Sequence, residues 1–502
     1  MAEYASALVE RGRRPAIAGL RLPSPFALSW ILSALLVAAF ELKVPSTVLW
    51  ALALGILACG ARLMQRRPID AIAILPVISL IGPITSLGAA TGASVQLGDL
   101  YLALIFAYFM VARGLAGRIA LGPERVRIGA IIILTFIGWC FSIDVMASIV
   151  PVIGLLQFLL VYVVTLNTVR DRKDAERVLW GWVGAVALSS ALIISAYVRG
   201  EALLLGVDQA YQSEFRSLTL TSDSFLFRAT FFVPGVIFPL GAATAMTAVL
   251  LLFPQRRGWL PQVALGVFLA TDLLAMGLLG NKTAMFATAV GAILMVAWTS
   301  RSRFGALRVT AAAGVVTGML LVGFALIREV MTPAQLLLFF NRLGEGASFW
   351  ERTVVWRRVA EHMIESPHAL YLGLGPEMSI RRVDHPLFNR LFYAGASGQG
   401  GAVDSGYVYV VINYGILNLL LIMSIVLAAW RMLTNKLLNE IDWIALSMWL
   451  CITIWMIMMI SQQSGVSKPV LMIIQVLAVC HALRSKTEWF VGRDVAKATA
   501  SG

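Results

Sequence analysis

Charged residues are scarce in this chain of 502 residues, where Asp, Glu, Lys and Arg together make up 13%. Soluble globular domains carry about 25%, so the composition excludes a soluble enzyme, a disordered chain and a nucleic-acid-binding module. Hydrophobic residues make up 59%, and the mean hydropathy is +0.83 over the whole length. The apolar residues are therefore not one anchor beside a soluble domain, and we predict an all-α polytopic membrane protein.

Motifs for metals and disulfides are also missing. The chain has four cysteines, no Cys-x-x-Cys and no Cys/His cluster, and each cysteine lies within an apolar stretch. Such cysteines behave as small buried hydrophobic residues, so neither a disulfide framework nor a zinc site is expected. The sequence also has no paired acidic motif of the kind that holds a divalent cation. We therefore predict a protein that uses no metal and no cofactor.

Long apolar runs fill most of the sequence. A helix needs roughly 20 apolar residues to cross about 30 Å of hydrocarbon. Breaks at charged, glycine and proline residues leave about fourteen such runs, which predicts about 12–14 transmembrane helices. The runs lie at residues 26–42, 44–62, 71–91, 96–113, 127–143, 146–168, 177–198, 229–253, 259–280, 282–299, 306–329, 404–430, 441–461 and 468–484.

Positive charge alternates from one connection to the next. The net charge is +13, with 40 Lys and Arg against 27 Asp and Glu. Of the 40 cations, 26 fall in alternate connections and the two terminal segments, whereas the short connections between them hold only Lys43, Lys282 and Lys468. Cytoplasmic loops accumulate Lys and Arg, so this pattern predicts an even number of spans with both termini in the cytoplasm. It explains the basic excess without nucleic acid, and no nucleic-acid partner is expected.

Spans and connections divide the chain into five parts. Only one region is both extended and polar, and it lies on the outer side in this topology. The parts are a cytoplasmic N-terminal tail at 1–25, a transmembrane bundle at 26–330 with an outer segment at 199–228, an outer loop domain at 331–403, C-terminal transmembrane helices at 404–484, and a cytoplasmic tail at 485–502.

Eleven cations are left over by this topology, and all of them are Arg. They lie in the two longer outer segments. The planar guanidinium of Arg binds phosphate through two parallel hydrogen bonds, so these residues indicate an anionic, phosphate-bearing ligand. The alternative is that long loops escape the charge bias and the side chains are simply solvated. The eleven are Arg199, Arg216, Arg228, Arg328, Arg342, Arg352, Arg357, Arg358, Arg381, Arg382 and Arg390.

The outer loop contains one segment with helical periodicity. Within 352–365 apolar residues recur every four positions, and Ser366-Pro367 is expected to end the helix because the residue before a proline is disfavoured in helical backbone. Such a helix lies at a membrane surface with its apolar stripe down. The following Gly373-x-Gly375 allows a tight turn and a close approach of the backbone to a ligand.

Three ionisable residues have two interpretations each. Asp404 is either the N-cap of the helix that starts after it or a carboxylate facing a lipid-headgroup substrate. Arg228 enters a span with an early Pro-Gly break, which fits the wall of a cavity, or it is an interfacial residue whose charge reaches the headgroups. Asp272 lies within a span, where a carboxylate is costly and marks either a function or a structural partner.

Taken in order, these residues resemble the O-antigen ligase and polymerase superfamily of bacterial surface-polysaccharide assembly. The family combines an Arg ahead of a Pro-containing span, a Ser/Thr-Arg pair opening a later span, and a long outer loop with Arg, Trp, Pro and Gly-x-Gly. A His-Asn or Asp-Asn pair then leads into a span. The resemblance covers roughly residues 220–430, and its elements are Arg228…Pro234, Asn281-Lys282-Thr283, Arg352…Trp356…Pro367…Gly373-x-Gly375 and Asp404-Ser405…Asn413-Tyr414-Gly415-Ile416.

Two positions depart from the family pattern. Lys282 stands where the family has Arg, and Asp404 stands where the ligases have His. The second difference favours a polymerase over a ligase, because this position is more variable among the polymerases.

The resemblance implies a helical, C-type glycosyltransferase of the bacterial inner membrane, with its active site facing the periplasm. It would transfer a glycan from undecaprenyl diphosphate to the non-reducing end of another lipid-linked repeat unit, without a metal. Arg228 and Arg352 would stabilise the diphosphate leaving group and Asp404 would act as the base, with Asp384 and Glu351 as second choices. The implied substrate-binding residues are Lys282, Trp356, Arg357, Gly373, Gly375, Arg381 and Tyr407.

Two other functions stay open. One is a ligase of the same superfamily, which would join a finished glycan to the lipid A core or to a protein. The other is a secondary transporter, to which many spans and the intramembrane Asp272 would be suited. Transporters are usually built from repeated halves, and no repeat is evident here. The expected partners are membrane lipids and the lipid-linked oligosaccharide, to which the resemblance adds a chain-length regulator and a flippase.

Overall fold

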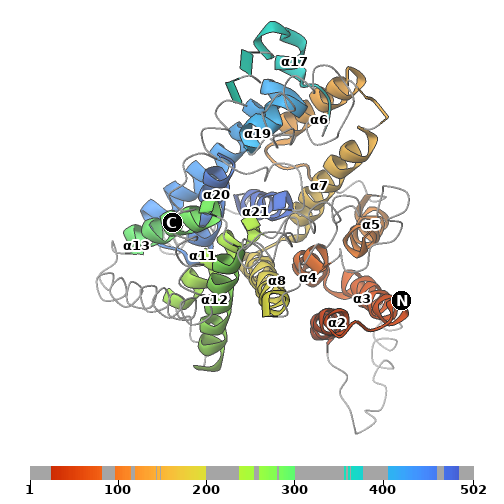
Figure 1. Ribbon diagram of the computed structural model, residues 1–502, viewed down its shortest axis with the longest axis vertical. Coiled ribbons are helices and arrows are strands. Elements are labelled where there is room, and N and C mark those ends of the chain that lie inside the picture. The colour runs from red at the N-terminus through yellow and green to blue at the C-terminus, as the bar shows by residue number, and fades with distance from the viewer. Residues whose placement is uncertain are drawn as a thin grey trace, which may run out of the picture.

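The computed structural model shows a bundle of α-helices (Figure 1). It describes residues 24–81, 96–114, 119–142, 144–146, 148–198, 237–253, 259–279, 282–299, 356–357, 360–361, 363–376, 405–460 and 469–484, and these contain no strand. The elements are α2 (Pro25–Glu41), α3 (Ser46–Arg66), α4 (Pro68–Ile81), α5 (Leu97–Phe109), the π-helix η3 (Met110–Gly114), α6 (Arg125–Cys140), α7 (Ile149–Thr168), α8 (Arg172–Val198), α11 (Ile237–Leu252), α12 (Trp259–Leu279), α13 (Lys282–Thr299), α17 (Pro367–Leu372), α19 (Gly406–Asn439), α20 (Trp443–Met458) and α21 (Pro469–Arg484).

Thirteen of the fourteen predicted apolar runs coincide with helices, and the remaining run, 306–329, lies outside the described residues. Four helices in the described part of the chain are long and apolar enough to cross a membrane, and they belong to α3, α8, α12 and α19. Eight further apolar helices have 10–17 residues, which at 1.5 Å per residue reach at most about 26 Å. This is the architecture of an all-α membrane protein, as the composition predicts.

Helices distant in sequence form the centre of the bundle. α4 packs along α8 and α7 along α21, while α11 contacts α12, α13 and α20. The indole of Trp182 on α8 donates to Gln475 Oε1 on α21 (2.7 Å), and Gln475 Nε2 donates to the carbonyl of Ile72 on α4 (3.5 Å). An apolar interior offers no water, so a buried polar group is costly unless the protein supplies its partner. These two bonds therefore fix α4, α8 and α21 to one another.

Charged side chains gather at one end of the bundle, which we call the ion-pair end. The starts of α4, α8 and α20 meet there. Asn167, near the end of α7, bonds both backbone groups of Ala120 ahead of α6 (2.9 and 2.7 Å). The cations belong to the alternate connections that were predicted to share one side of a membrane, and their meeting agrees with that pattern. The pairs are Arg172–Asp442 (2.9 Å), Arg177–Asp70 (3.3 Å), Arg127–Glu124 (2.7 Å) and Arg484–Glu124 (3.8 Å).

Candidate functional site

A glycine breaks α19 near its start. Gly415 has φ 81° and ψ 164°, far from helical backbone, and divides the helix into a short first segment and a long second one. Glycine adopts a positive φ without the steric cost that a Cβ imposes. The break frees carbonyl groups at the end of the first segment, and that of Ile412 accepts from the N–H of Leu374 at 2.6 Å. The kink is therefore capped by a segment from elsewhere in the chain.

The capping segment is α17 with the Gly373-x-Gly375 turn that follows it. The two glycines have φ 84° and 116°. A Cβ on Gly373 would lie 2.5 Å from the carbonyl group of Asn413, and one on Gly375 would collide with the side chain of Ser142. The close backbone approach predicted from the sequence is thus present, and its partners are the kink of α19 and the residues after α6. Contact of these glycines with a substrate stays a prediction.

The end of α6 completes this arrangement. A Cβ on Gly138 would lie 2.6 Å from the carbonyl oxygen of Leu372, and one on Gly415 would collide with the carbonyl oxygen of Tyr371. Three segments therefore meet backbone to backbone: the end of α6, α17 and the kink of α19. We call this the α6–α17–α19 junction. Figure 1 shows it at one tip of the molecule, and α6 runs from there to the ion-pair end.

The helix predicted over 352–365 is described only in part. Its described residues are helical, and Arg357 Nε donates to Glu361 Oε1 at 2.8 Å across one turn. Ser366-Pro367 interrupts the helix as predicted. The same pair also starts a new helix, because Ser366 is the N-cap of α17 and Pro367 occupies its first turn. Proline suits that position, since the first N–H of a helix has no intrahelical partner. The sequence did not predict this second helix.

The residues predicted to carry out catalysis lie outside the described part of the chain. The same holds for one predicted substrate-binding residue and for both second-choice bases. Their roles stay predictions. These residues are Arg228, Arg352, Asp404, Arg381, Asp384 and Glu351.

Four other predicted binding residues fall in three places. Trp356 is half-buried and Arg357 is exposed, and both lie on the partly described outer helix that leads to α17. Tyr407 lies in the first turn of α19, where its hydroxyl donates to the carbonyl of Met456 at the end of α20 (2.8 Å). Lys282 begins α13, which packs on α11 and α20. The structure therefore places Tyr407 on the helix that Gly373 contacts.

The N-cap of α19 is Ser405, and the interpretation of Asp404 as that cap is wrong. Ser405 Oγ accepts from the N–H of Val408 (3.5 Å) and donates to the carbonyl of Met459 (3.3 Å). The hydroxyl thus satisfies one free N–H of the helix start and ties α19 to α20. Of the two interpretations of Asp404, the substrate-facing carboxylate is the one that stays a prediction.

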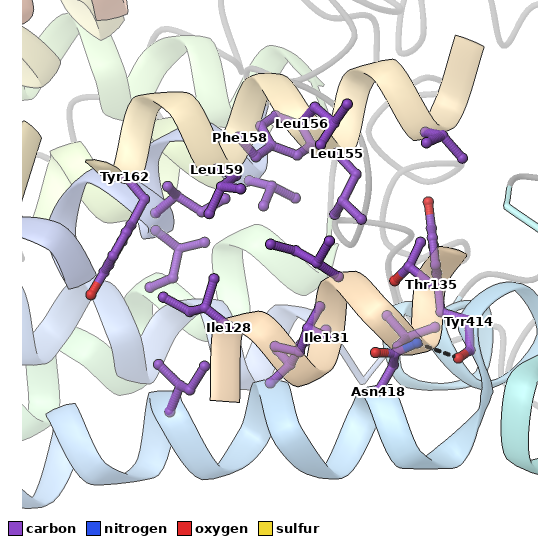
Figure 2. A pocket seen from close by; sticks show the side chains of 18 of the residues that line it. Ile128, Ile131, Thr135, Leu155, Leu156, Phe158, Leu159, Tyr162, Tyr414 and Asn418 are labelled. Atoms are coloured by element: carbon purple, nitrogen blue, oxygen red, sulfur yellow. Dashed lines mark hydrogen bonds between the residues drawn. The ribbon is translucent and has the colours of Figure 1, made fainter. Parts of the chain in front are cut away.

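An apolar cavity of about 460 Å³ adjoins the junction (Figure 2). Its walls come from α6, α7, α19, α20 and α21, and its described lining contains no Asp, Glu, Lys, Arg or His. Tyr414 and Asn418, on either side of the α19 kink, belong to the lining. The volume falls within the range of about 300–1,000 Å³ that is typical of ligand pockets. The sequence did not predict this cavity, because its walls are distant in sequence.

The buried carboxylate of Asp272 lies outside this cavity. Asp272 is 0% exposed within α12, and Ser190 Oγ on α8 donates to its Oδ1 at 2.8 Å. The structure thus supplies the partner that one interpretation of Asp272 required.

Three cysteines are buried as predicted, whereas Cys140 at the end of α6 is exposed. No group of three or more His, Cys, Asp or Glu residues that could hold a metal occurs within the described residues.

No family model matches the chain, and no curated protein matches it significantly. The candidate site therefore rests on the chain's own sequence and geometry.

Proposed function

We propose that the protein is a polymerase of a bacterial surface polysaccharide such as O-antigen, capsule or exopolysaccharide. It transfers a glycan from undecaprenyl diphosphate to the non-reducing end of another lipid-linked repeat unit, at the periplasmic face of the inner membrane. In this proposal the chain has about 12–14 spans and the C-type glycosyltransferase architecture. Both termini and the ion-pair end lie on the cytoplasmic side, and the loop of residues 331–403 lies in the periplasm.

The observation that carries the proposal is the uncharged cavity beside the α6–α17–α19 junction. A polyprenyl diphosphate has a long apolar tail and a highly charged head. The cavity suits the tail, because its described lining is apolar and uncharged. The segment that caps the kink, at Leu374, belongs to the loop that contains most of the arginines left over by the topology. The cavity for the tail and the arginine-containing loop therefore meet at the α6–α17–α19 junction. A substrate with an apolar tail and a charged head requires two such sites next to each other.

The chemistry is a displacement at the anomeric carbon of the donor. The acceptor hydroxyl gives its proton to Asp404, and its oxygen forms the new bond to the anomeric carbon as the bond to the diphosphate oxygen breaks. Negative charge grows on the leaving diphosphate. Arg228 and Arg352, with Lys282, stabilise that charge as preorganised cations. Because these cations replace a divalent metal in this role, the reaction needs none.

The first test is elongation by the purified full-length protein supplied with synthetic lipid-linked repeat units. Ladder-like products attached to the polyprenyl carrier support a polymerase. In cells, deletion of the gene is expected to remove long chains while single repeats still reach their acceptor. Accumulation of long lipid-linked chains in the deletion strain would instead identify a ligase.

Removal of divalent cations is expected to leave elongation unchanged, since arginines rather than a metal neutralise the diphosphate. The measurement compares the initial elongation rate of the purified protein in EDTA with the rate after adding magnesium. A rate that disappears in EDTA and returns with magnesium would contradict the metal-independent mechanism.

Replacing Asp272 with asparagine is expected to change the free energy of unfolding by no more than about 1 kcal/mol, because the amide keeps the oxygen that accepts from Ser190. Elongation is also expected to stay unchanged. Thermal unfolding of the purified variant and its elongation rate check both points. A variant of normal stability that no longer elongates would show that the carboxylate itself is needed and that Asp272 has more than a structural role.

A further inference from the structure

The cavity is open on one side, between α6 and α7. Four of its lining residues are exposed, and all four come from these two helices. Phe136 on α6 is 54% exposed, and Ile153 and Leu156 on α7 are 50% and 45% exposed. The lining residues of α19, α20 and α21 are buried or half-buried. In a membrane-spanning bundle, an apolar opening of this kind faces hydrocarbon rather than water.

The end of the cavity that points to the ion-pair end is closed. Tyr162 lines the cavity there and is 6% exposed, and its hydroxyl shares a 2.8 Å hydrogen bond with Nδ1 of His481 on α21. The ion pairs of Glu124 with Arg127 and Arg484 lie at this same end. An apolar chain gains nothing by entering a charged layer. Tyr162 is therefore the floor of the cavity.

The opposite end carries the polar groups. Figure 2 shows Thr135, Tyr414 and Asn418 together at one end, with Tyr162 at the other. Asn418 is 1% exposed, and its Oδ1 has no hydrogen-bond partner within the described part of the chain. Buried polar atoms are nearly always paired, so this oxygen can accept a hydrogen bond from a donor on a ligand, such as a sugar hydroxyl. It lies close to the junction.

We infer that one polyprenyl tail enters the cavity sideways from the bilayer through the opening between α6 and α7. Its polar end stops at Asn418 beside the junction, and its apolar part runs toward Tyr162. From Ile149 to Tyr162 the lining follows α7 for about 20 Å at the rise of a helix. The rest of a longer tail stays in the bilayer outside the opening, whose exposed lining residues are Phe136, Ile149, Ile153 and Leu156. The identity of the tail rests on the proposed function.

The occupant is one apolar chain, and its assignment to an isoprenoid lipid rests on the proposed function. The cavity of about 460 Å³ is of a size that holds one drug-sized molecule, so two acyl chains are too large for it. Its described lining has no cation to hold a phosphate inside. The charged head therefore lies beyond Asn418, on the side of the loop.

The test uses the full-length protein in lipid nanodiscs and a polyprenyl phosphate with a photoreactive group in its tail. Tryptophan in place of Ile153 fills the opening, and tryptophan in place of Ile133 is the matched control. Ile133 lies on α6, the other helix beside the opening, and is 61% exposed, but it is not part of the lining. We expect I153W to weaken binding at least about tenfold by overfilling the opening, with cross-links of the unmodified protein on α6 and α7. I133W is expected to bind like the unmodified protein.

Three results would each overturn the inference. The first is equal binding by I153W and I133W when both unfold at the normal temperature. The second is a set of cross-links confined to helices other than α6 and α7. The third is equal competition by a phospholipid, which would make the occupant an acyl chain. Binding is measured without elongation, so the two proposals fail separately. Normal cross-linking with no elongation would overturn the polymerase, whereas elongation by I153W at the normal rate and affinity would overturn the entrance alone.

Discussion

Alanine in place of Gly415 is expected to destabilise the protein by about 2–6 kcal/mol. An L-residue held at a positive φ costs roughly 1–3 kcal/mol, and inserting an atom into a packed contact adds about as much again. Both apply here, because φ is 81° and the new Cβ would collide with the carbonyl oxygen of Tyr371. The measurement is the unfolding midpoint of the purified full-length variant in detergent.

Gly154 provides the matched control for this substitution. It lies within α7, and a Cβ there would meet no atom within 4 Å. Alanine favours helical backbone over glycine by up to about 1 kcal/mol, so G154A is expected to unfold at the same temperature or slightly higher. Equal midpoints for G415A and G154A would show that the kink of α19 is not fixed by its contact with α17.

Most of the helices could be predicted, since a long apolar run leaves a membrane-embedded backbone few alternatives to a helix. The break between α12 and α13 was predicted at Gly280-Asn281-Lys282, and the helices end at Leu279 and restart at Lys282. The described cations that meet at the ion-pair end likewise belong to connections that were predicted to share one side of a membrane. These features depend on local composition alone.

The kink of α19 could not be predicted in this way. Gly415 lies in an apolar run, where glycine is also compatible with an unbroken helix. The break is stable because Leu374, about 40 residues earlier in the sequence, donates to the freed carbonyl of Ile412. A contact between such distant segments leaves no local signal. The same holds for the Tyr162–His481 pair, whose members lie 319 residues apart.

The Gly-x-Gly turn shows how a correct local prediction can leave its partner open. A close backbone approach was expected at Gly373 and Gly375, and both glycines make one. The sequence suggested a ligand as the partner, whereas the described partners are Asn413 and Ser142. Tight packing against protein and close approach to a ligand demand the same missing Cβ, so the motif alone does not distinguish them.

Alanine in place of Arg352 is expected to lower the rate of elongation about 100- to 1,000-fold, the usual cost of removing one preorganised group that stabilises transition-state charge. R228A is expected to behave alike. Lysine at position 352 keeps the charge but loses the two-pronged phosphate contact, so R352K is expected to fall between R352A and the unmodified protein. Steady-state rates with purified lipid-linked repeats measure the effect.

The control is R431A. Arg431 is exposed on α19 in the part of the helix that leads to the ion-pair end, far along the chain from the kink. It belongs to the cations assigned to the cytoplasmic side, so its loss is expected to leave elongation unchanged. Equal rates for R352A and R431A would contradict the diphosphate role of Arg352.

Asparagine in place of Asp404 separates the base from the charge clamp. Losing a general base costs about 100- to 10,000-fold in rate, while an amide can still hydrogen-bond a sugar hydroxyl. We therefore expect D404N to lower kcat with little change in KM, and to keep normal binding of the polyprenyl phosphate probe, since a base acts on the acceptor hydroxyl and not on the tail. A D404N protein that elongates at the normal rate would assign the proton to another acceptor, and Asp384 and Glu351 would then be the next variants to measure.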